Sequence, residues 1–346
     1  MKRAWARLVA FGAHQESATA LALVRICVAL SMLVLLVPYC LFDVPGFVWV
    51  DQQFGGYRNV RGDWRVEGLS ELFGGVSPAL VQGLLAVDLA AALLLLVGVL
   101  GRLPAFIALQ ASAAIFRLNP DVSGAADILL TDVLFLLWLG NANVTLSIDA
   151  YRGTGRVFCP GTMIASWPRR LIVYQLIVMY VTTGLQKCVS VAWTPGGGFT
   201  ALFEILQSPH WGRFPDLPLA PLFALTVVGS AVTMIWEIGF PLVLVKRARI
   251  PFVVVGMGFH LAILVLMEVG IFSLISMAYY PALFFGDEWD AWARRVREGK
   301  LRWFKNRRSG SAPSGDASKD ASMDPLTDPG AASADRAAPG PAPSGG

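Results

Sequence analysis

The sequence predicts an all-α integral membrane protein with about eight transmembrane helices, cytoplasmic N- and C-termini and a disordered C-terminal tail. Hydrophobic residues make up 55% of its 346 residues and charged residues only 15%, against roughly 25% charged in an ordinary soluble domain. So few charges cannot cover a soluble globule, which argues against a water-soluble enzyme. The chain has only four cysteines and no CxxC spacing, so a disulfide scaffold is also excluded.

Apolar stretches of suitable length define the predicted spans, because about 20 apolar residues cross the hydrocarbon core of a bilayer. The first stretch is longer than a signal-peptide core and no small-residue cleavage site follows it, so we expect it to be retained. The predicted spans are roughly 18–42, 79–100, 103–118, 124–142, 169–188, 219–245, 250–267 and 270–286.

The placement of lysines and arginines supports this count, since cytoplasmic loops retain positive charge. With the N-terminus inside, nineteen basic residues fall on inside segments and five fall on outside loops. The net charge of +4 therefore reflects topology and contact with anionic lipid, not nucleic-acid binding. We expect a multi-pass protein of the cell membrane whose constant partner is the lipid bilayer.

Three segments flank the predicted transmembrane domain, which covers residues 18–286. Residues 1–17 form a cytoplasmic N-terminal segment. Residues 287–308 combine eight basic residues with three tryptophans, a composition typical of a helix lying at the membrane interface. A solvated basic tail anchored by its tryptophans is the alternative. Residues 309–346 are rich in Ser, Pro, Gly, Ala and Asp and lack aromatics, which predicts disorder.

Ionisable residues inside the spans are the candidates for function, because each is costly in lipid unless it is paired or solvated. Lys187 closes the fifth span, Glu237 lies deep in the sixth and His260 lies near the middle of the seventh. Arg25 is near the cytoplasmic end of the first span, where snorkelling to the interface explains it. Asp88 lies in the second span.

Two interpretations of these residues stay open. In the structural one, Lys187 with Glu237, or Arg25 with Asp88, forms a buried ion pair that holds helices together. In the functional one, a desolvated Lys187 acts as a general base, with His260 and Glu237 positioning or relaying protons. The three histidines include no i, i+4 pair, and no phosphate loop or dinucleotide fingerprint occurs. We therefore predict no metal site.

Four stretches carry a family resemblance, in the order 22–26, 127–149, 180–196 and 259–278. The third contains Tyr180, Gly184, Lys187 and Trp193, and it is similar to the lysine segment of a known membrane domain. Together the stretches resemble the HTTM superfamily, the membrane domain shared with vitamin K-dependent gamma-carboxylase. The resemblance spans the whole predicted transmembrane domain.

The resemblance implies a catalytic role for Lys187, at the place of the carboxylase's active-site lysine. That lysine acts with vitamin K hydroquinone and oxygen, so the resemblance implies a quinone-type cofactor and assigns Tyr180 and Trp193 to its binding. Three features differ: Gln186 replaces the first of two adjacent lysines, residues 125–127 hold no functional histidine, and no large propeptide-binding domain follows residue 290. Glutamate carboxylation of secreted proteins is therefore not implied.

The sequence leaves two functions open. One is a carboxylase-like membrane enzyme that uses a lysine base near the outer membrane face with a quinone-type cofactor. The alternative is a non-enzymatic accessory protein for the maturation of, or immunity to, a secreted peptide, in which Lys187 only pairs helices. Its further partner would be that peptide or another membrane protein. A transporter is disfavoured, because the two halves show no inverted repeat.

Overall fold

The computed structural model describes residues 9–58, 72, 74–119, 122–216, 218 and 220–309. The chain divides into one unit that ends at Val296 and a second that begins at Arg297. Helices dominate the described residues, as the predicted class requires. The tail that was predicted to be disordered, 309–346, lies outside the described residues except for Ser309.

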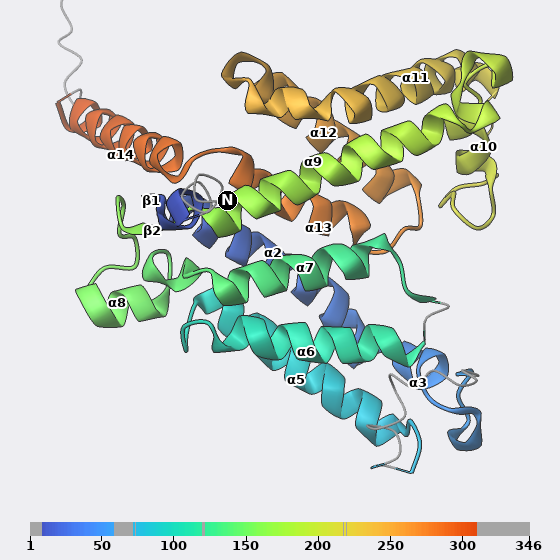
Figure 1. The fold of residues 1–346 in the computed structure, drawn as a ribbon, viewed down its shortest axis with the longest axis horizontal. Helices are drawn as coiled ribbons and strands as arrows, with labels where there is room; N and C mark the ends of the chain where they lie inside the picture. Colours follow the sequence, from blue (N-terminus) through green and yellow to red (C-terminus); the bar gives the residue numbers. More distant parts are fainter. Residues whose placement is uncertain are drawn as a thin grey trace, which may run out of the picture. The chain divides into compact units, whose positions relative to one another are not determined.

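Nine helices of the described residues lie in the predicted spans or in the basic segment that follows them (Figure 1). They are α2 (Thr19–Leu41), α5 (Pro78–Val97), α6 (Leu103–Leu118), α7 (Ala125–Leu139), α9 (Trp167–Cys188), α11 (Phe223–Gly239), α12 (Lys246–Leu266), α13 (Phe272–Ala278) and α14 (Gly286–Ser309).

Shorter elements connect these helices. The short α-helices are α3 (Val44–Val48), α8 (Ile148–Thr154) and α10 (Ala201–Gln207). The 3₁₀ turns that matter below are η3 (Ala142–Val144), η4 (Val191–Trp193), η7 (Phe240–Leu244) and η8 (Tyr280–Leu283). One small antiparallel sheet joins β1 (Gln15–Ser17) to β2 (Met163–Ala165), an element that the all-α prediction does not include.

Five segments within the described residues are long and apolar enough to cross a membrane. They are Thr19–Leu41, Pro78–Val97, Trp167–Cys188, Ala220–Leu244 and Lys246–Leu266. These coincide with five of the predicted spans and confirm a protein with membrane helices. The other predicted spans form the shorter helices α6, α7 and α13, of 16, 15 and 7 residues. The count of eight and the orientation of the termini stay predictions.

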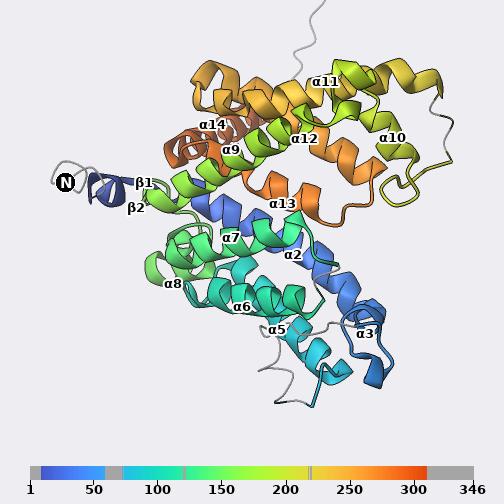
Figure 2. The ribbon, with the colours of Figure 1, turned by 45° about the vertical axis from the view of Figure 1, so that its right-hand side comes forward.

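The helices of the first unit form two groups. In one group, α2, α5, α6 and α7 pack against one another in that order, and in the other α9 packs against α11. The helix α10 lies on α11, and α12 packs against η7. Because α13 contacts α2, α7 and α12, it joins the two groups (Figure 2). The candidate site lies where α9, α11, α12 and η8 meet.

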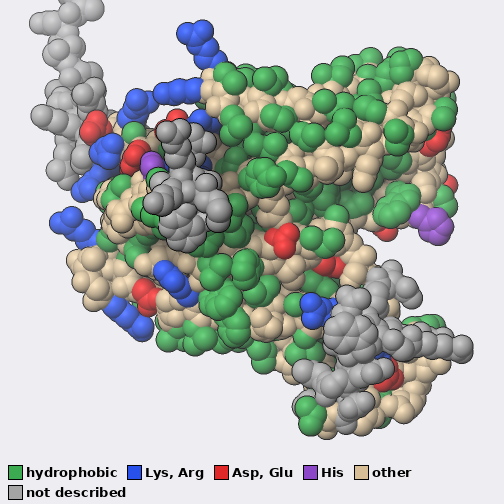
Figure 3. Space-filling model, viewed as in Figure 1, with side chains coloured by type: hydrophobic (Ala, Val, Ile, Leu, Met, Phe, Trp, Pro, Cys, Tyr) green, Lys and Arg blue, Asp and Glu red, His purple; other side chains and the backbone are tan. Residues whose placement is uncertain are grey.

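Lysine and arginine side chains gather toward one end of the first unit, where α8 lies and α12 begins (Figure 3). Hydrophobic side chains cover much of the surface over α9 and α11 in the same view. A band of apolar surface with basic residues beyond one edge is the pattern that the positive-inside rule describes. It agrees with the membrane location of these helices.

Arg25 is buried inside the helix bundle, so its predicted snorkelling to the interface is wrong. Only 1% of its surface is exposed. Its guanidinium donates to the carbonyls of Ala142 and Leu146, at 3.1 and 2.5 Å, and to Oδ1 of Asn143 at 2.7 Å. These acceptors belong to the irregular turn after α7, whose carbonyls lack helical partners and need a donor.

The predicted pair between Arg25 and Asp88 is also wrong. Asp88 is buried on α5 and accepts a hydrogen bond from Oγ of Ser112 on α6, at 2.7 Å. The guanidinium of Arg25 instead donates hydrogen bonds to backbone and amide oxygens in and after η3. Neutral groups are therefore the hydrogen-bond partners of both charged side chains, and Nε of Arg25 and Oδ1 of Asp88 have no partner among the described residues.

The first turns of α14 are tied to the start of α2. Asp290 is 2% exposed and accepts three hydrogen bonds, from Oγ of Ser17 at 2.7 Å, Oγ1 of Thr19 at 2.5 Å and the backbone N–H of Gly161 at 2.8 Å. The segment that was predicted to be interfacial, 287–308, is thus helical and begins as a packed element. Its location at the interface stays a prediction.

Candidate functional site

One face of α9 carries three residues of the lysine segment. Tyr180, Gly184 and Lys187 follow one another at spacings of four and three residues, which places them on the same side of the helix. This side packs against α11, and a methyl group at Gly184 would lie 2.8 Å from Cγ1 of Ile238 and 3.0 Å from Cβ of Glu237. The missing side chain lets the two helices approach closely, so Lys187 lies beside Glu237.

Lys187 and Glu237 form an ion pair between α9 and α11. Nζ of Lys187 lies 2.6 Å from each carboxylate oxygen. The side chain of Glu237 is only 4% exposed, whereas that of Lys187 is 20% exposed. The ring of Trp193 in η4 lies over the ammonium, 4.9 Å from Nζ to the ring centroid, within cation–π range. An ammonium has three N–H donors, so one is left after the two bonds to Glu237.

Tyr180 and His260 form a second buried polar group two helical turns away along α9. The Tyr180 hydroxyl and Nε2 of His260 share a hydrogen bond of 2.5 Å, and the hydroxyl of Tyr280 lies 3.2 Å from that of Tyr180. His260 is fully buried. Its other ring nitrogen, Nδ1, has no hydrogen-bond partner among the described residues. The three side chains come from α9, α12 and η8, so they join three elements.

Aromatic rings enclose this second group. The rings of Trp236 and Phe240 lie 4.7 and 4.3 Å from the ring of Tyr180. The rings of Phe259 and Phe272 lie 5.3 and 5.8 Å from the ring of His260. The imidazole is therefore sealed from solvent, while Lys187 remains partly accessible. Of the two polar groups, only the ion pair is open to a reactant.

The ion pair lies far from the loop end of α11. Glu237 follows Leu225 by twelve positions, which is about 18 Å of helix at 1.5 Å per residue. Leu225, Val228 and Val232 in this stretch are apolar and exposed, which suits contact with lipid. The pair therefore lies near the end of α11 that leads into η7, and near the end of α9 that leads into η4.

The structure brings the predicted site residues together in two sets. Lys187, Glu237 and Trp193 form one, and Tyr180 with His260 forms the other. The predicted structural pairing of Lys187 with Glu237 is present. Sequence reasoning missed Tyr280 and Trp236, although Trp236 directly precedes Glu237 in the chain. Aromatic residues are common in apolar helices, so their number alone did not single these two out. No group of three metal-ligating side chains occurs among the described residues.

Comparison with protein families gives one match. The model of the HTTM domain matches residues 14–289, which is most of the chain and contains both sets of site residues. Neither the curated proteins nor the solved structures contain a significant match.

Proposed function

Because the chain belongs to the HTTM domain family, we propose that it is a carboxylase-like membrane enzyme that uses a hydroquinone cofactor. Its proton-accepting group is the pair of Lys187 and Glu237. The observation that carries the proposal is the unequal exposure of this pair. The carboxylate is buried and fixed, whereas 20% of the lysine side chain stays open. A helix-pairing charge has no need of such an opening.

The pair can hold a proton in either of two places. With the proton on Nζ, the side chains are an ammonium and a carboxylate. The contacts of 2.6 Å allow the proton to pass to Glu237, which leaves a free amine beside Trp193. That amine then accepts a proton from a group that approaches the exposed side of Lys187. Glu237 acts as the store for the first proton.

The residues at the exposed side of Lys187 fit a hydroquinone head group. The spare N–H of Lys187 offers a polar contact to a ring oxygen, and the Trp193 ring offers an aromatic surface. The apolar exposed face of α11 suits an isoprenoid tail that stays in lipid. By the family resemblance, a bound hydroquinone oxidised by oxygen would supply a base strong enough to remove a proton from a C–H bond.

Tyr180 and His260 have a positioning role in this proposal. Their hydrogen bond fixes the face of α9 that carries Lys187 against α12, and Tyr280 adds the link to η8. Both side chains are buried. Tyr180 was predicted to contact the cofactor, and we now assign that contact to Trp193 and Lys187.

A non-enzymatic accessory protein is the second candidate. The observation in its favour is the bidentate bond between Lys187 and Glu237, which is also the geometry of a charge pair that only joins helices. In that case the chain would serve the maturation of, or immunity to, a secreted peptide. The two candidates differ in whether a hydroquinone binds.

Hydroquinone binding and oxidation distinguish these candidates. The protein is purified in detergent, and a short-tailed menaquinol is added. Tryptophan fluorescence reports binding, and oxygen consumption reports oxidation. Lys187→Ala and Lys187→Arg are compared with Arg249→Met, which removes a buried cation from another ion pair, with Glu288 at 2.7 Å. Thermal unfolding shows whether each variant is folded.

We expect the unchanged protein and Arg249→Met to bind and oxidise menaquinol. Lys187→Ala should lose oxidation by about 100-fold or more, the usual effect of removing a general base, and Lys187→Arg should recover little of it because guanidinium does not deprotonate. Absence of menaquinol binding by the unchanged protein would rule out the enzyme and favour the accessory protein. Full activity of Lys187→Ala would show that the lysine is only structural.

A further inference from the structure

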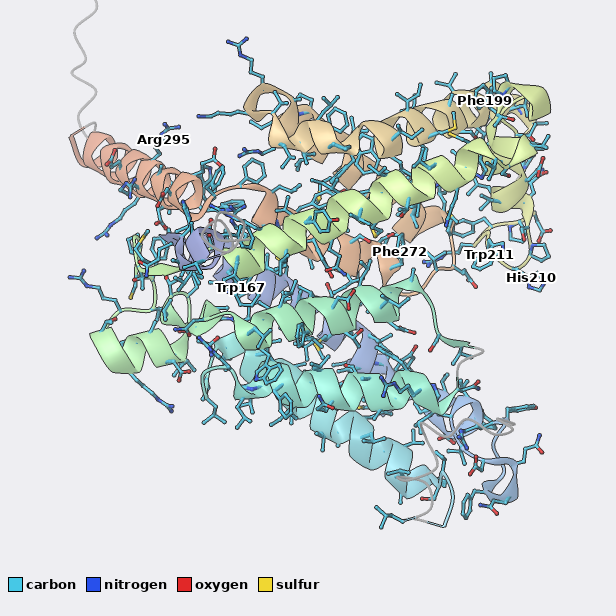
Figure 4. All side chains as sticks on the ribbon, in the orientation of Figure 1. Trp167, Phe199, His210, Trp211, Phe272 and Arg295 are labelled. Carbon is cyan, nitrogen blue, oxygen red and sulfur yellow. The ribbon has the colours of Figure 1, made fainter. Side chains whose placement is uncertain are left out.

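A pocket of about 390 Å³ lies between the start of α12 and the first part of α14. Lys246 and Ile250 of α12 line one side of it, and Trp289, Trp292 and Arg295 of α14 line the other. Figure 4 labels Arg295 on α14. All of these residues belong to the first unit of the chain, so the two walls of the pocket are parts of one packed body.

An ion pair joins the two helices beside the pocket. Nη1 of Arg249 lies 2.7 Å from Oε2 of Glu288, and the same oxygen accepts from the N–H of Phe285 at 2.9 Å. Lys246 precedes Arg249 by three positions, about 4.5 Å of helix. Arg295 follows Glu288 by seven positions, about 10.5 Å of helix. Both spacings return to the same side of a helix, so the two basic residues lie on the faces that the ion pair brings together.

The pocket has an excess of positive charge. Glu288 is the single acid that lines it among the described residues, and Arg249 already pairs with this carboxylate. Lys246 and Arg295 are exposed, and neither has a hydrogen-bond or ion-pair partner within the described part of the chain. Two unpaired cations on facing walls attract an anion.

An exposed apolar stripe leads away from Lys246 along α12. Five apolar side chains recur every three or four positions, which places them on one side of the helix. They are Ile250, Val254, Met257, Leu261 and Val265, and all are exposed. The helix Lys246–Leu266 is long and apolar enough to cross a membrane, and Lys246 is its first residue. A ligand that matches both features is an anion joined to a long hydrocarbon chain.

Two tryptophans place the pocket at the level of lipid headgroups. The indole N–H of Trp289 donates to the carbonyl of Pro281 at 3.0 Å, whereas Trp292 is exposed. Their rings meet edge to face, with centroids 6.2 Å apart. Tryptophan is enriched where headgroups meet the hydrocarbon core. A cationic pocket at this level meets membrane lipid before it meets a soluble anion.

We propose that this pocket is a discrete site for an anionic phospholipid, with the phosphate between Lys246 and Arg295 and an acyl chain along the stripe of α12. A zwitterionic choline headgroup fits less well, because it brings a third cation beside these two. The proposal goes beyond the chemistry assigned to Lys187 and does not rest on it, because neither Lys187 nor Glu237 lines the pocket. It also differs from a general attraction of basic segments to lipid, which requires no particular residues.

Lipid binding to the full chain tests this proposal. The protein is purified in detergent and stripped of lipid. Native mass spectrometry then resolves lipid adducts and any dimer, and it gives the dissociation constant of the first bound lipid. The lipid probes are dioleoyl-phosphatidylglycerol and dioleoyl-phosphatidylcholine. The competitor is glycerophosphoglycerol, which is the anionic headgroup without acyl chains.

The test variant combines Lys246→Gln with Arg295→Gln. The matched control combines Arg247→Gln with Arg294→Gln, which removes the same charge from the same two helices. Arg247 and Arg294 are exposed and directly adjacent in sequence to the tested residues, but they do not line the pocket. Thermal unfolding confirms that both variants are folded. A diffuse basic surface would respond equally to the two pairs of substitutions.

We expect phosphatidylglycerol to bind about tenfold or more tightly than phosphatidylcholine. Each basic residue near anionic lipid contributes about fivefold, so the Lys246/Arg295 variant should weaken phosphatidylglycerol about 25-fold. The Arg247/Arg294 control should change its affinity little, and excess glycerophosphoglycerol should not displace it.

Equal binding of the two lipids or an equal effect of the control pair would overturn the proposal. Displacement by glycerophosphoglycerol would instead show a site for a free anion, and a dimer in place of the lipid adduct would show that a second copy covers α12. Either result would also overturn it. None of these results bears on menaquinol oxidation.

Discussion

Two glycines of α12 offer a direct test of the packing around His260. Gly256 and Gly258 are two residues apart in the same helix. A methyl group at Gly256 would lie 2.3 Å from the hydroxyl of Tyr280 and 2.6 Å from Cζ2 of Trp236, whereas one at Gly258 would meet nothing within 4 Å. Alanine therefore collides with the aromatic cluster at the first position and with nothing at the second.

The expected difference follows from these contacts. Both substitutions gain about 0.8–1 kcal/mol of helix propensity, so that gain cancels when the variants are compared. Overpacking at Gly256 costs about 1–3 kcal/mol, because the Tyr280 hydroxyl must move away from Tyr180. Thermal unfolding in detergent, followed by tryptophan fluorescence, should show Gly256→Ala melting below Gly258→Ala. Equal melting, or a more stable Gly256→Ala, would refute the packing described here.

Three further predictions concern buried polar groups and use the same unfolding assay. Lys187→Met should lower the free energy of unfolding by about 3–5 kcal/mol, because it leaves Glu237 buried and unpaired. Adding Glu237→Leu should recover most of this loss of stability. Strictly additive effects of the two substitutions would contradict the ion pair. Arg25→Met should destabilise the protein by about 3 kcal/mol or more, because the hydrogen bonds of the guanidinium are lost. Arg25→Lys should keep only part of this stability, since an ammonium lacks the planar fork of a guanidinium. An unchanged melting temperature of Arg25→Met would be inconsistent with the burial of Arg25. Asp290→Asn should lower the free energy of unfolding by about 1–3 kcal/mol, because a single amide oxygen would face three donors. It should also speed limited proteolysis at the start of α14. Unaltered proteolysis would argue against the hydrogen bonds that tie Asp290 to the start of α2.

The sequence predicted the parts of the fold that depend on composition and spacing. Apolar length predicted the helices, and the resemblance of the segment that contains Tyr180, Gly184 and Lys187 predicted the family. The pairing of Lys187 with Glu237 could be proposed because few ionisable residues lie in these spans and each needs a partner. Because ionisable residues are rare in these spans, each one narrows the choice of partners for the others.

The predictions that were wrong concern hydrogen-bond partners that the residue types in the sequence do not identify. Arg25 was expected to snorkel or to pair with Asp88, yet it binds carbonyls exposed where the chain leaves α7. Every residue has a carbonyl, so nothing in the sequence marked those of Ala142 and Leu146 as free. Tyr280 was missed for a similar reason, since its role depends on the approach of α12 at Gly256. Only the three-dimensional packing defines that approach.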